Sequence, residues 1–332
     1  MRFAIIGAGI AGLAAADELK RHGHSVTLFD KGRGAGGRMS TRRAETAAGE
    51  LTWDHGAQYF TARSDDFRAR LAPLFALGHV AIWSPRLVDV RFETGAWRIS
   101  EQAPRLAGDE MYVGTPSMNS VIKAMAEPHE VYWSSRVTGI ELAGTEKHLL
   151  FEDGRRQGAF DSVISAIPAE QASQLLAPVS DRLANEASQV SSAPCWAVML
   201  AFDTQLPVNW YGARVHNAPL SWIARNSTKP GRTGLETVVL HASPEWSAAN
   251  VDLRRDEVVE RLTRLFRELS GAPQPVYSTG HRWLLAMVKN GVGEAFGWDA
   301  RVNIGTVGDW RIAPRVEAAW QSGHSLGEFL TG

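Results

Sequence analysis

Three glycines near the N-terminus have the spacing that binding of a dinucleotide's phosphates requires. Gly7, Gly9 and Gly12 follow the apolar run Phe3–Ile6 and open a segment with helical character. Gly7 permits a tight turn, Gly9 leaves room for a pyrophosphate, and Gly12 lets the helix lie close to the strand. The N-terminus of such a helix also offers free N–H groups and a partial positive charge to phosphate oxygens.

An acidic residue stands where recognition of a ribose would need it. Asp30 follows the second predicted strand, Ser25–Phe29, and lies 18 residues beyond Gly12. A carboxylate at this place can accept hydrogen bonds from ribose hydroxyls. The alternative is a glycine turn in an ordinary α/β protein. Strand, glycines, helix and acid occur in the required order and favour a dinucleotide site, although they do not separate NAD from FAD.

A second glycine cluster, Gly34–Thr41, contains Gly36-Gly37-Arg38. Its alternative interpretation is a flexible basic loop that contacts RNA, because the 13 residues 31–43 contain five basic residues and no acid. They are Lys31, Arg33, Arg38, Arg42 and Arg43. The chain lacks the overall basic charge that would support RNA binding.

The whole chain has the composition of a globular protein with two domains. It has 332 residues, 44% of them hydrophobic, and 35 basic against 36 acidic residues give a formal charge of −1. At about 150 residues per domain, this length predicts two domains with a sizeable core. The charge balance argues against a nucleic-acid partner or an anionic membrane surface. The lone Cys195 excludes a disulfide framework and a Cys-ligated metal, so we expect no metal and a cytoplasmic location.

The start of the chain imitates a secretory signal peptide, because Arg2 precedes the uncharged run Phe3–Ala16. Its glycines would weaken a signal helix, since each costs about 1 kcal/mol relative to alanine. We therefore interpret this region as strand, turn and helix. No other stretch reaches the roughly 18 apolar residues that a membrane span requires.

Hydrophobic periodicity predicts the elements that must position these residues. Helices are expected at Asp65–Leu77, Thr115–Ala126 with Ser117 as a cap, a segment from Pro168 to Leu176, Asp252–Leu269 and Val316–Leu330. Strands are expected near Leu87–Phe92, Ala96–Ser100, Val131–Trp133, Val137–Leu142, His148–Phe151, Asp161–Ala166, Trp196–Phe202, Leu220–Arg225, Glu236–His241 and Val302–Val307, with a loop after Trp283. This order predicts an α/β fold, α+β overall, with interleaved domains.

Four ordered segments resemble the flavin-containing amine oxidase superfamily. They are Gly36-Gly37-Arg38, Asp54-His55-Gly56-Ala57, the strand and proline stop at Phe160–Pro168, and Gly308-Asp309 followed by Val316-Glu317-Ala318-Ala319. The resemblance implies FAD as cofactor, bound by a Rossmann-type domain interleaved with a mixed-sheet substrate domain. This architecture is shared by amine oxidases and p-hydroxybenzoate hydroxylase. Ala318 departs from the pattern, because the superfamily often has glycine there.

The resemblance also implies domain boundaries and residues that contact FAD. The FAD-binding domain would comprise 1–70, 111–166 and 292–332, and the substrate domain 71–110 and 167–291. The residues implied to bind FAD are Gly7, Gly9, Ala11, Gly12, Asp30, Lys31, Gly37, Arg38, Met39, Asp54, Gly56, Ala57, Val137, Gly308, Asp309, Val316 and Glu317.

Within the superfamily, Asp54–Phe60 and His281-Arg282-Trp283 are most similar to renalase and its bacterial relatives. Many amine oxidases carry a lysine near the flavin on a strand that corresponds to Ala193–Phe202, and this stretch has none. A renalase-like protein would take a hydride from 2- or 6-dihydro-NAD(P) isomers and pass electrons to oxygen, giving hydrogen peroxide. An FAD-dependent amine oxidase or desaturase, and a non-catalytic flavin- or lipid-binding module, remain alternatives. No protein partner is evident.

The resemblance places a substrate pocket on the flavin face away from the Rossmann core. Its candidate residues are Gln58, Tyr59, Trp222, Arg225, His241 and Trp283. Aromatic walls suit a flat nicotinamide ring, and Arg225 would meet a phosphate or carboxamide. Alternatively, the tryptophans are ordinary core residues and His241 is a hydrogen-bonded strand histidine. Hydride transfer from an electron-rich dihydropyridine to a flavin needs no general base.

Overall fold

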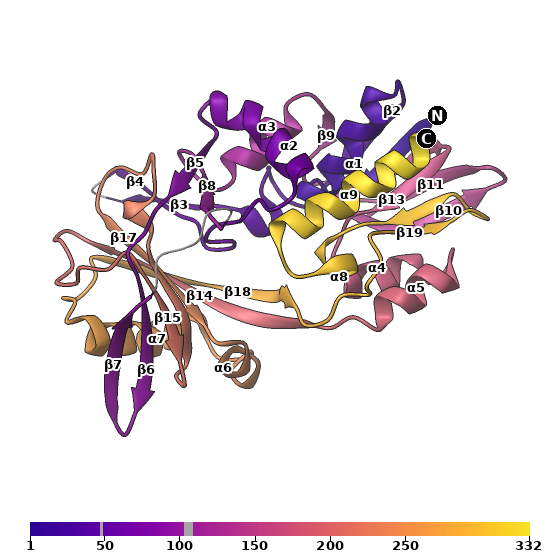
Figure 1. Cartoon of the computed structure of the whole chain (residues 1–332). Coiled ribbons are helices and arrows are strands. Elements are labelled where there is room, and N and C mark those ends of the chain that lie inside the picture. The colour runs from indigo at the N-terminus through magenta and orange to yellow at the C-terminus, as the bar shows by residue number, and fades with distance from the viewer. Residues whose placement is uncertain (47–48, 103–108) are drawn as a thin grey trace.

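A parallel sheet forms the centre of the nucleotide-binding part in the computed structural model, which describes residues 1–46, 49–102 and 109–332 (Figure 1). Its strand order is β19 (Gly297–Asp299), β20 (Ile304–Thr306), β13 (Ser162–Ser165), β1 (Arg2–Ile6), β2 (Ser25–Phe29) and β9 (Glu130–Tyr132). Only β19 pairs antiparallel with its neighbour among these strands. The N-terminal strand lies inside the sheet, as in Rossmann-type folds, and the predicted fold class is confirmed.

The two faces of this sheet carry different layers, since successive strand residues point to opposite sides. Phe3 and Ile5 face α1 (Ile10–Arg21) and α9 (Val316–Thr331), which lie side by side in Figure 1. Gly323 permits this approach, because a Cβ there would lie 1.9 Å from the Ala11 carbonyl oxygen. The opposite face packs against α4 (Ala169–Leu176), α5 (Asp181–Ser188) and a small sheet of β10 (Val137–Ala143), β11 (Glu146–Phe151) and β12 (Arg156–Phe160).

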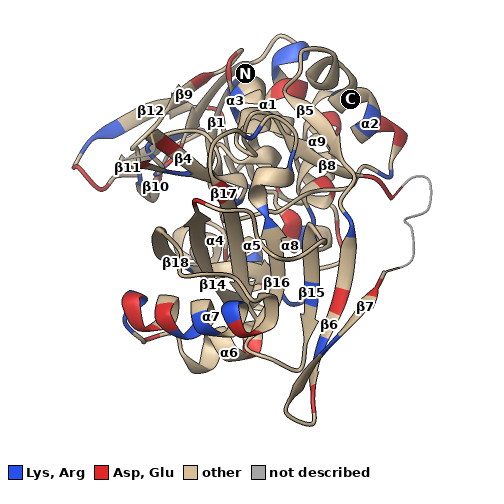
Figure 2. Ribbon diagram, turned by 90° about the vertical axis from the view of Figure 1, so that its left-hand side faces the viewer, with Lys and Arg blue, Asp and Glu red and all other residues tan. Residues whose placement is uncertain are grey.

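A second, mixed sheet forms the other half of the molecule. Its order is β18 (Tyr277–Val288), β14 (Ser192–Phe202), β17 (Glu236–Ala242), β16 (Leu220–Arg225), β15 (Gly212–His216), β6 (Leu87–Glu93) and β7 (Ala96–Glu101). One face is covered by α7 (Arg255–Ser270), near α6 (Pro244–Ala249). Val258, Leu262 and Phe266 of α7 are buried against the sheet, while its charged residues lie on the outside (Figure 2).

Short ribbons and helices connect the two sheets. They are β3 (Arg42–Thr46) with β4 (Gly49–Trp53), β5 (Val80–Trp83) with β8 (Met111–Gly114), α2 (Asp65–Ala76) and α3 (Ser120–Ala126). Leu51 and Trp53 of β4 pack on Met199 and Val239, on the sheet face away from α7. Trp53 also donates a hydrogen bond to the Leu200 carbonyl at 2.8 Å. The segment that follows β4 is therefore held over this face.

Three predicted elements differ from the structure. The helix expected from Thr115 begins at Ser120, and Ser117 does not cap it, because the preceding turn is bound to another segment through Met118 N–H. The helix expected from Asp252 begins at Arg255. The loop expected after Trp283 is wrong, since β18 continues to Val288 through pairing with β14.

The domain boundary expected at residues 166–167 also differs from the packing. Helices α4 and α5 bury Ala172, Leu176 and Leu183 in the same hydrophobic cluster as Ala4 and Ile6 of β1. They therefore belong with the nucleotide-binding sheet, and the second sheet's part begins near β14. The predicted segments 1–70 and 71–110 include residues 47–48 and 103–108, which lie outside the described residues.

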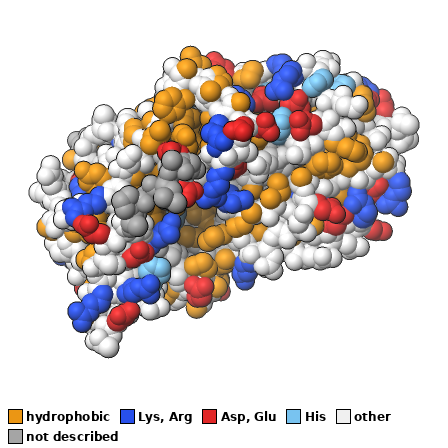
Figure 3. Space-filling view, viewed as in Figure 1, with side chains coloured by type: hydrophobic (Ala, Val, Ile, Leu, Met, Phe, Trp, Pro, Cys, Tyr) orange, Lys and Arg blue, Asp and Glu red, His pale blue; other side chains and the backbone are white. Residues whose placement is uncertain are grey.

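Basic and acidic side chains are intermixed on the face shown in Figure 3, in keeping with a formal charge of −1. Among the described residues, no helix is both long enough and apolar enough to cross a membrane.

Candidate active site

The two glycine clusters meet at the N-terminus of α1. A Cβ at Gly12 would lie 2.1 Å from the Gly7 carbonyl oxygen, so this position admits only glycine. A Cβ at Gly9 would meet nothing within 4 Å, and one at Gly37 would lie 4.0 Å from the Gly9 Cα. Gly9 is the N-cap of α1 and leaves its first N–H groups without a side-chain cap. The open space beside these N–H groups fits an anionic pyrophosphate.

The Asp30 side chain stabilises this glycine turn through hydrogen bonds. Its carboxylate accepts hydrogen bonds from Ala8 N–H at 2.8 Å and from Gly32 N–H at 2.7 Å. The side chain thus fixes the loop on either side of β2, at the end of the strand where it was predicted. Contact of Asp30 with a ribose stays a prediction.

Arg38 and Asp309 form a bidentate ion pair that joins motifs 271 residues apart. Arg38 Nη1 donates to Asp309 Oδ2 at 2.7 Å. Gly308, with a φ of +152°, precedes the short helix α8 (Asp309–Ile312). The Arg38 side chain is 35% exposed, so its guanidinium remains within reach of a ligand.

The segment Asp54–Gln58 is held through its backbone, and we call it the flavin loop after the FAD contact predicted for it. The His55 carbonyl accepts hydrogen bonds from Trp283 Nε1 at 3.0 Å and from His241 Nε2 at 3.1 Å. The Gln58 amide donates to the carbonyls of Asp54 and Gly56. Ala57 N–H donates to the Arg38 carbonyl at 2.9 Å. A Cβ at Gly56 would lie 2.1 Å from that same oxygen, so glycine is required for this close approach.

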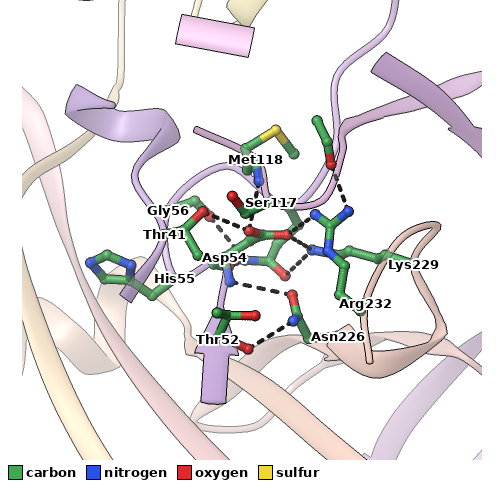
Figure 4. Close-up of polar contacts among 12 residues, drawn as sticks. Thr41, Thr52, Asp54, His55, Gly56, Ser117, Met118, Asn226, Lys229 and Arg232 are labelled. Atoms are coloured by element: carbon green, nitrogen blue, oxygen red, sulfur yellow. Dashed lines mark hydrogen bonds and ion pairs between the residues drawn. The ribbon is translucent and has the colours of Figure 1, made fainter. Parts of the chain in front are cut away.

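The Asp54 side chain lies at the centre of a buried polar cluster (Figure 4). Oδ1 accepts from Thr41 Oγ1 and Met118 N–H, both at 2.9 Å. Oδ2 accepts from Lys229 Nζ at 3.2 Å and from Arg232. Burial alone would raise the pKa of Asp54, but the two cations outweigh it and lower the pKa to about 2. Asp54 is therefore ionised at neutral pH.

The sheet face that is turned toward the flavin loop carries a row of aromatic and histidine rings. Trp222, His241, Ala197 and His281 pair in sequence across β16, β17, β14 and β18. Paired residues of neighbouring strands share one face, so these side chains point together toward the loop. Trp283, two residues beyond His281, lies on the same face and stacks on His55 with ring centroids 5.0 Å apart.

The three histidines of this region are neutral at physiological pH. Burial lowers the pKa of His55 to about 3, with smaller contributions from His281, His241 and Arg42. Burial also lowers the pKa of His241 to about 4. The pKa of His281 is lowered by burial and by Arg42. Because His241 Nε2 bonds to a carbonyl, that nitrogen carries the ring proton.

Two predicted site residues have other roles in the structure. Arg225 lies three residues after Trp222 on β16 and so points to the opposite face. It donates to both carboxylate oxygens of Glu236, at 3.0 and 2.8 Å, and we withdraw it from the substrate pocket. Glu317 accepts hydrogen bonds from the backbone N–H groups of Arg63 and Ser64 and so anchors the start of α2, and its contact with FAD stays a prediction.

The other predicted residues lie in several elements. Lys31 donates to Gln171 at 3.2 Å, Met39 is buried, Val137 is half-buried at the start of β10, and Val316 begins α9. The ring centroids of Tyr59 and Trp222 lie 5.7 Å apart. The structure thus brings Gln58, Tyr59, Trp222, His241 and Trp283 together.

Sequence reasoning missed the partners of Asp54, namely Thr41, Met118, Lys229 and Arg232. A buried carboxylate needs a cation or hydrogen-bond donors, so a partner was to be expected. The identity of that partner was not available, because Lys229 lies 175 residues away in a loop after β16.

Comparison with known proteins shows the family to which the chain belongs. The family model of flavin-containing amine oxidoreductases matches residues 63–296, and that of an NAD(P)-binding Rossmann-like domain matches residues 5–73. The chain therefore belongs to the flavin-containing amine oxidoreductase family. It is a flavin-dependent oxidoreductase with FAD as its cofactor. The glycine cradle and Arg38 fit the pyrophosphate of such a dinucleotide.

Curated relatives match only short segments. Mitochondrial protoporphyrinogen oxidase of Nicotiana tabacum is 46% identical over 65 residues, which is 20% of this chain and 12% of that protein. The 4,4'-diapophytoene desaturase of Staphylococcus aureus is 52% identical over 40 residues, or 12% of this chain and 8% of that protein. The chain thus spans a small part of the length of these relatives.

Solved structures share the fold over nearly the whole chain. A protein assigned as a protoporphyrinogen oxidase, from Exiguobacterium sp. 255-15, has a TM-score of 0.78 at 15% identity. The match covers 99% of this chain and 98% of that chain. Cyclohexylamine oxidase from Brevibacterium oxydans has a TM-score of 0.78 at 13% identity, with the same coverage. Putrescine oxidase bound to putrescine has a TM-score of 0.71 at 16% identity and covers 99% of both chains.

Proposed function

We propose that the protein is a renalase-like, FAD-dependent oxidase. It takes a hydride from 2- or 6-dihydro-NAD(P) isomers, gives NAD(P)+, and passes the electrons to oxygen to form hydrogen peroxide. The observation that carries this proposal is the row of uncharged rings facing the flavin loop, with Trp222, His241, His281 and Trp283 on one sheet face. Such a surface suits a flat, neutral dihydropyridine.

The charges around this surface favour the same class of substrate. Burial is the main cause of the lowered pKa values of these histidines, but Arg42 adds to it at His55 and His281 and Lys229 at His241, while Asp54 acts in the opposite direction at His55. Two cations therefore lie near the rings. A positive field opposes the approach of an ammonium group and favours a ligand that carries phosphates. Dihydronicotinamide dinucleotides have a neutral reactive ring and an anionic pyrophosphate, whereas amines are mostly cationic at neutral pH.

The chain's own residues orient the substrate rather than exchange protons with it. The bound flavin supplies the hydride-accepting chemistry, which requires no general base when the donor is a dihydropyridine. The neutral His241 and Trp283 bond to the flavin loop, and their rings contribute to the wall. Orientation of the ring and exclusion of water are then the protein's contributions to the rate.

Anaerobic mixing of the FAD-loaded protein with each candidate tests the proposal. We expect 2- and 6-dihydro-NAD(P) to bleach the flavin absorbance rapidly, and ordinary NADH to do so poorly. Putrescine and cyclohexylamine, which appear in the names of two similar solved structures, form the comparison arm. Bleaching by these amines and not by the isomers would replace the proposal with an amine oxidase.

Admission of oxygen then tests the second half of the reaction. We expect one hydrogen peroxide for each substrate oxidised, since the two electrons of one hydride, with two protons, reduce one O2 to one H2O2. Absence of peroxide would point to another electron acceptor. Failure of every candidate to bleach the flavin would favour a non-catalytic flavin- or lipid-binding module.

A further inference from the structure

Lys229 is fully enclosed, yet it is not used by the proposed reaction. Its side chain is 0% exposed. The ammonium group donates to Asp54 Oδ2 at 3.2 Å and to Gln58 Oε1 at 3.4 Å, and lies 5.6 Å from the centre of the Trp83 ring. Both hydrogen-bond partners are the terminal residues of the flavin loop. Lys229 thus contacts the loop from behind at each of its ends.

The charges of this cluster do not balance. Asp54 supplies one negative charge, while Lys229 and Arg232, whose side chains are 0% and 2% exposed, supply two positive charges. Burial lowers the pKa of Lys229 to about 8, and Asp54 opposes this shift. Lys229 therefore carries its proton at neutral pH, and one positive charge remains in excess behind the loop.

This excess charge is not needed to hold Asp54. Without Lys229, the Asp54 carboxylate would still be paired with Arg232 and bonded to Thr41 and Met118. An unbalanced buried cation lowers stability, and apolar replacement of buried ionic groups is often neutral or stabilising. The Asp54 carboxylate therefore gives no reason for a lysine here. What a donor at this position supplies is the hydrogen bond to Gln58 Oε1.

We propose that Lys229 is a positioning residue of the flavin loop, which orients the Gln58 amide and favours reduction of the bound flavin through its excess charge. With Oε1 bound to Lys229, the Gln58 amide nitrogen is directed to the carbonyls of Asp54 and Gly56. A positive charge near a flavin favours the negative charge gained on reduction. This inference rests on the loop's contact with the flavin, which the proposed function also uses, but not on the identity of the substrate.

The test is the reduction potential and the stability of FAD-loaded Lys229→Met. We expect its unfolding free energy in urea to stay close to that of the wild type, because the unbalanced charge is removed while Gln58 Oε1 loses its donor. We also expect the two-electron reduction equilibrium of the flavin to fall at least tenfold, which corresponds to about 30 mV. Lys229→Gln, which removes the charge and retains a donor, should show the same shift in potential. Lys229→Arg, which retains the charge, should keep the potential of the wild type.

A double-mutant cycle with Gln58→Met tests the route of the effect. If Lys229 orients the loop through Gln58, then Lys229→Met should slow flavin reduction less in the Gln58→Met background than in the wild type. Loss of stability or failure to fold in Lys229→Met, or an unchanged potential, would overturn the inference and make Lys229 a structural residue. An altered potential in a protein that does not oxidise dihydronicotinamide isomers would leave the inference standing and overturn the proposed substrate.

Discussion

Two charge clusters flank the flavin loop, and they differ in burial and in charge balance. Arg38 and Asp309 form a balanced pair whose guanidinium side chain is 35% exposed. Asp54, Lys229 and Arg232 form an unbalanced cluster in which no side chain is more than 2% exposed. The first pair joins the glycine clusters to the last helices, and the second lies behind the loop.

The difference separates a contact that a ligand can reach from one that it cannot. The Arg38 side chain is 35% exposed and the Asp309 side chain 8%, so the guanidinium is the end of this pair that water or a ligand phosphate can reach. The side chains of the Asp54 cluster are enclosed, and removal of Asp54 would leave two buried cations without an anion. Accordingly, we assign ligand binding to the Arg38 side and a fixed framework to the Asp54 side.

The largest expected effect comes from Asp54→Asn. This substitution leaves Lys229 and Arg232 buried without an anion, so the unfolding free energy should fall by about 3–5 kcal/mol. Asp309→Asn is the matched control, because exposed Arg38 stays solvated and the loss should be about 1 kcal/mol. Urea unfolding in saturating FAD measures both. Similar losses in the two variants would contradict the distinction between the clusters.

A pH titration of stability addresses the neutral histidines beside the buried cluster. Burial lowers the pKa of His55 to about 3 and that of His241 to about 4, from an ordinary value of 6.5, so between these values the unfolded chain binds more protons than the folded one. Their contribution to stability is present above pH 6.5 and is lost as the pH falls. We expect a decrease of roughly 2 kcal/mol per pH unit between pH 6 and pH 4.5.

His55→Phe should remove about half of that pH dependence, because one of the two titrating groups is gone. Unfolding in urea at several pH values gives the slope. A slope equal to that of the wild type would mean that His55 is protonated in the native state and that its ring is not enclosed by Trp283 and His281.

On the ligand side, Gly9→Ala should affect binding and not folding. A Cβ there meets no protein atom within 4 Å, so stability should change by less than about 1 kcal/mol. The methyl group would occupy the space predicted for the pyrophosphate, and FAD affinity should fall at least tenfold, or about 1.4 kcal/mol. Gly12→Ala is the opposite case, since its Cβ would clash with Gly7 and should destabilise the fold itself. Equal FAD affinity in Gly9→Ala and wild type would remove the pyrophosphate from this place.

The smallest effect distinguishes two tryptophans on the same sheet face. Trp283→Phe removes the N–H that binds the His55 carbonyl and should cost about 1 kcal/mol of stability. Trp222 Nε1 is buried with no hydrogen-bond partner among the described residues, so Trp222→Phe should leave stability unchanged or slightly higher. Thermal unfolding of the two variants compares them, and a larger loss in Trp222→Phe would show that its N–H is satisfied.

The site could be predicted from sequence only where its geometry is local. Gly7, Gly9, Gly12 and Asp30 act within one strand–helix–strand unit, and their order was sufficient to locate the cradle. The face of Arg225 was also available, because a residue three positions from Trp222 on a strand must point the other way. The substrate-pocket prediction did not apply that rule.

By itself, then, the sequence determined the Rossmann unit and most of the helices and strands, because turns, caps and hydrophobic periodicity depend on neighbouring residues. The loop that follows β4 was expected only from the resemblance to the amine oxidase superfamily. Only the tertiary structure decided the partners across the chain. Arg38 meets Asp309 over 271 residues, and Asp54 meets Lys229 over 175. Strand register placed Trp222, His241 and His281 in one row. Such pairings follow from how two sheets pack around one loop, and no local pattern encodes them.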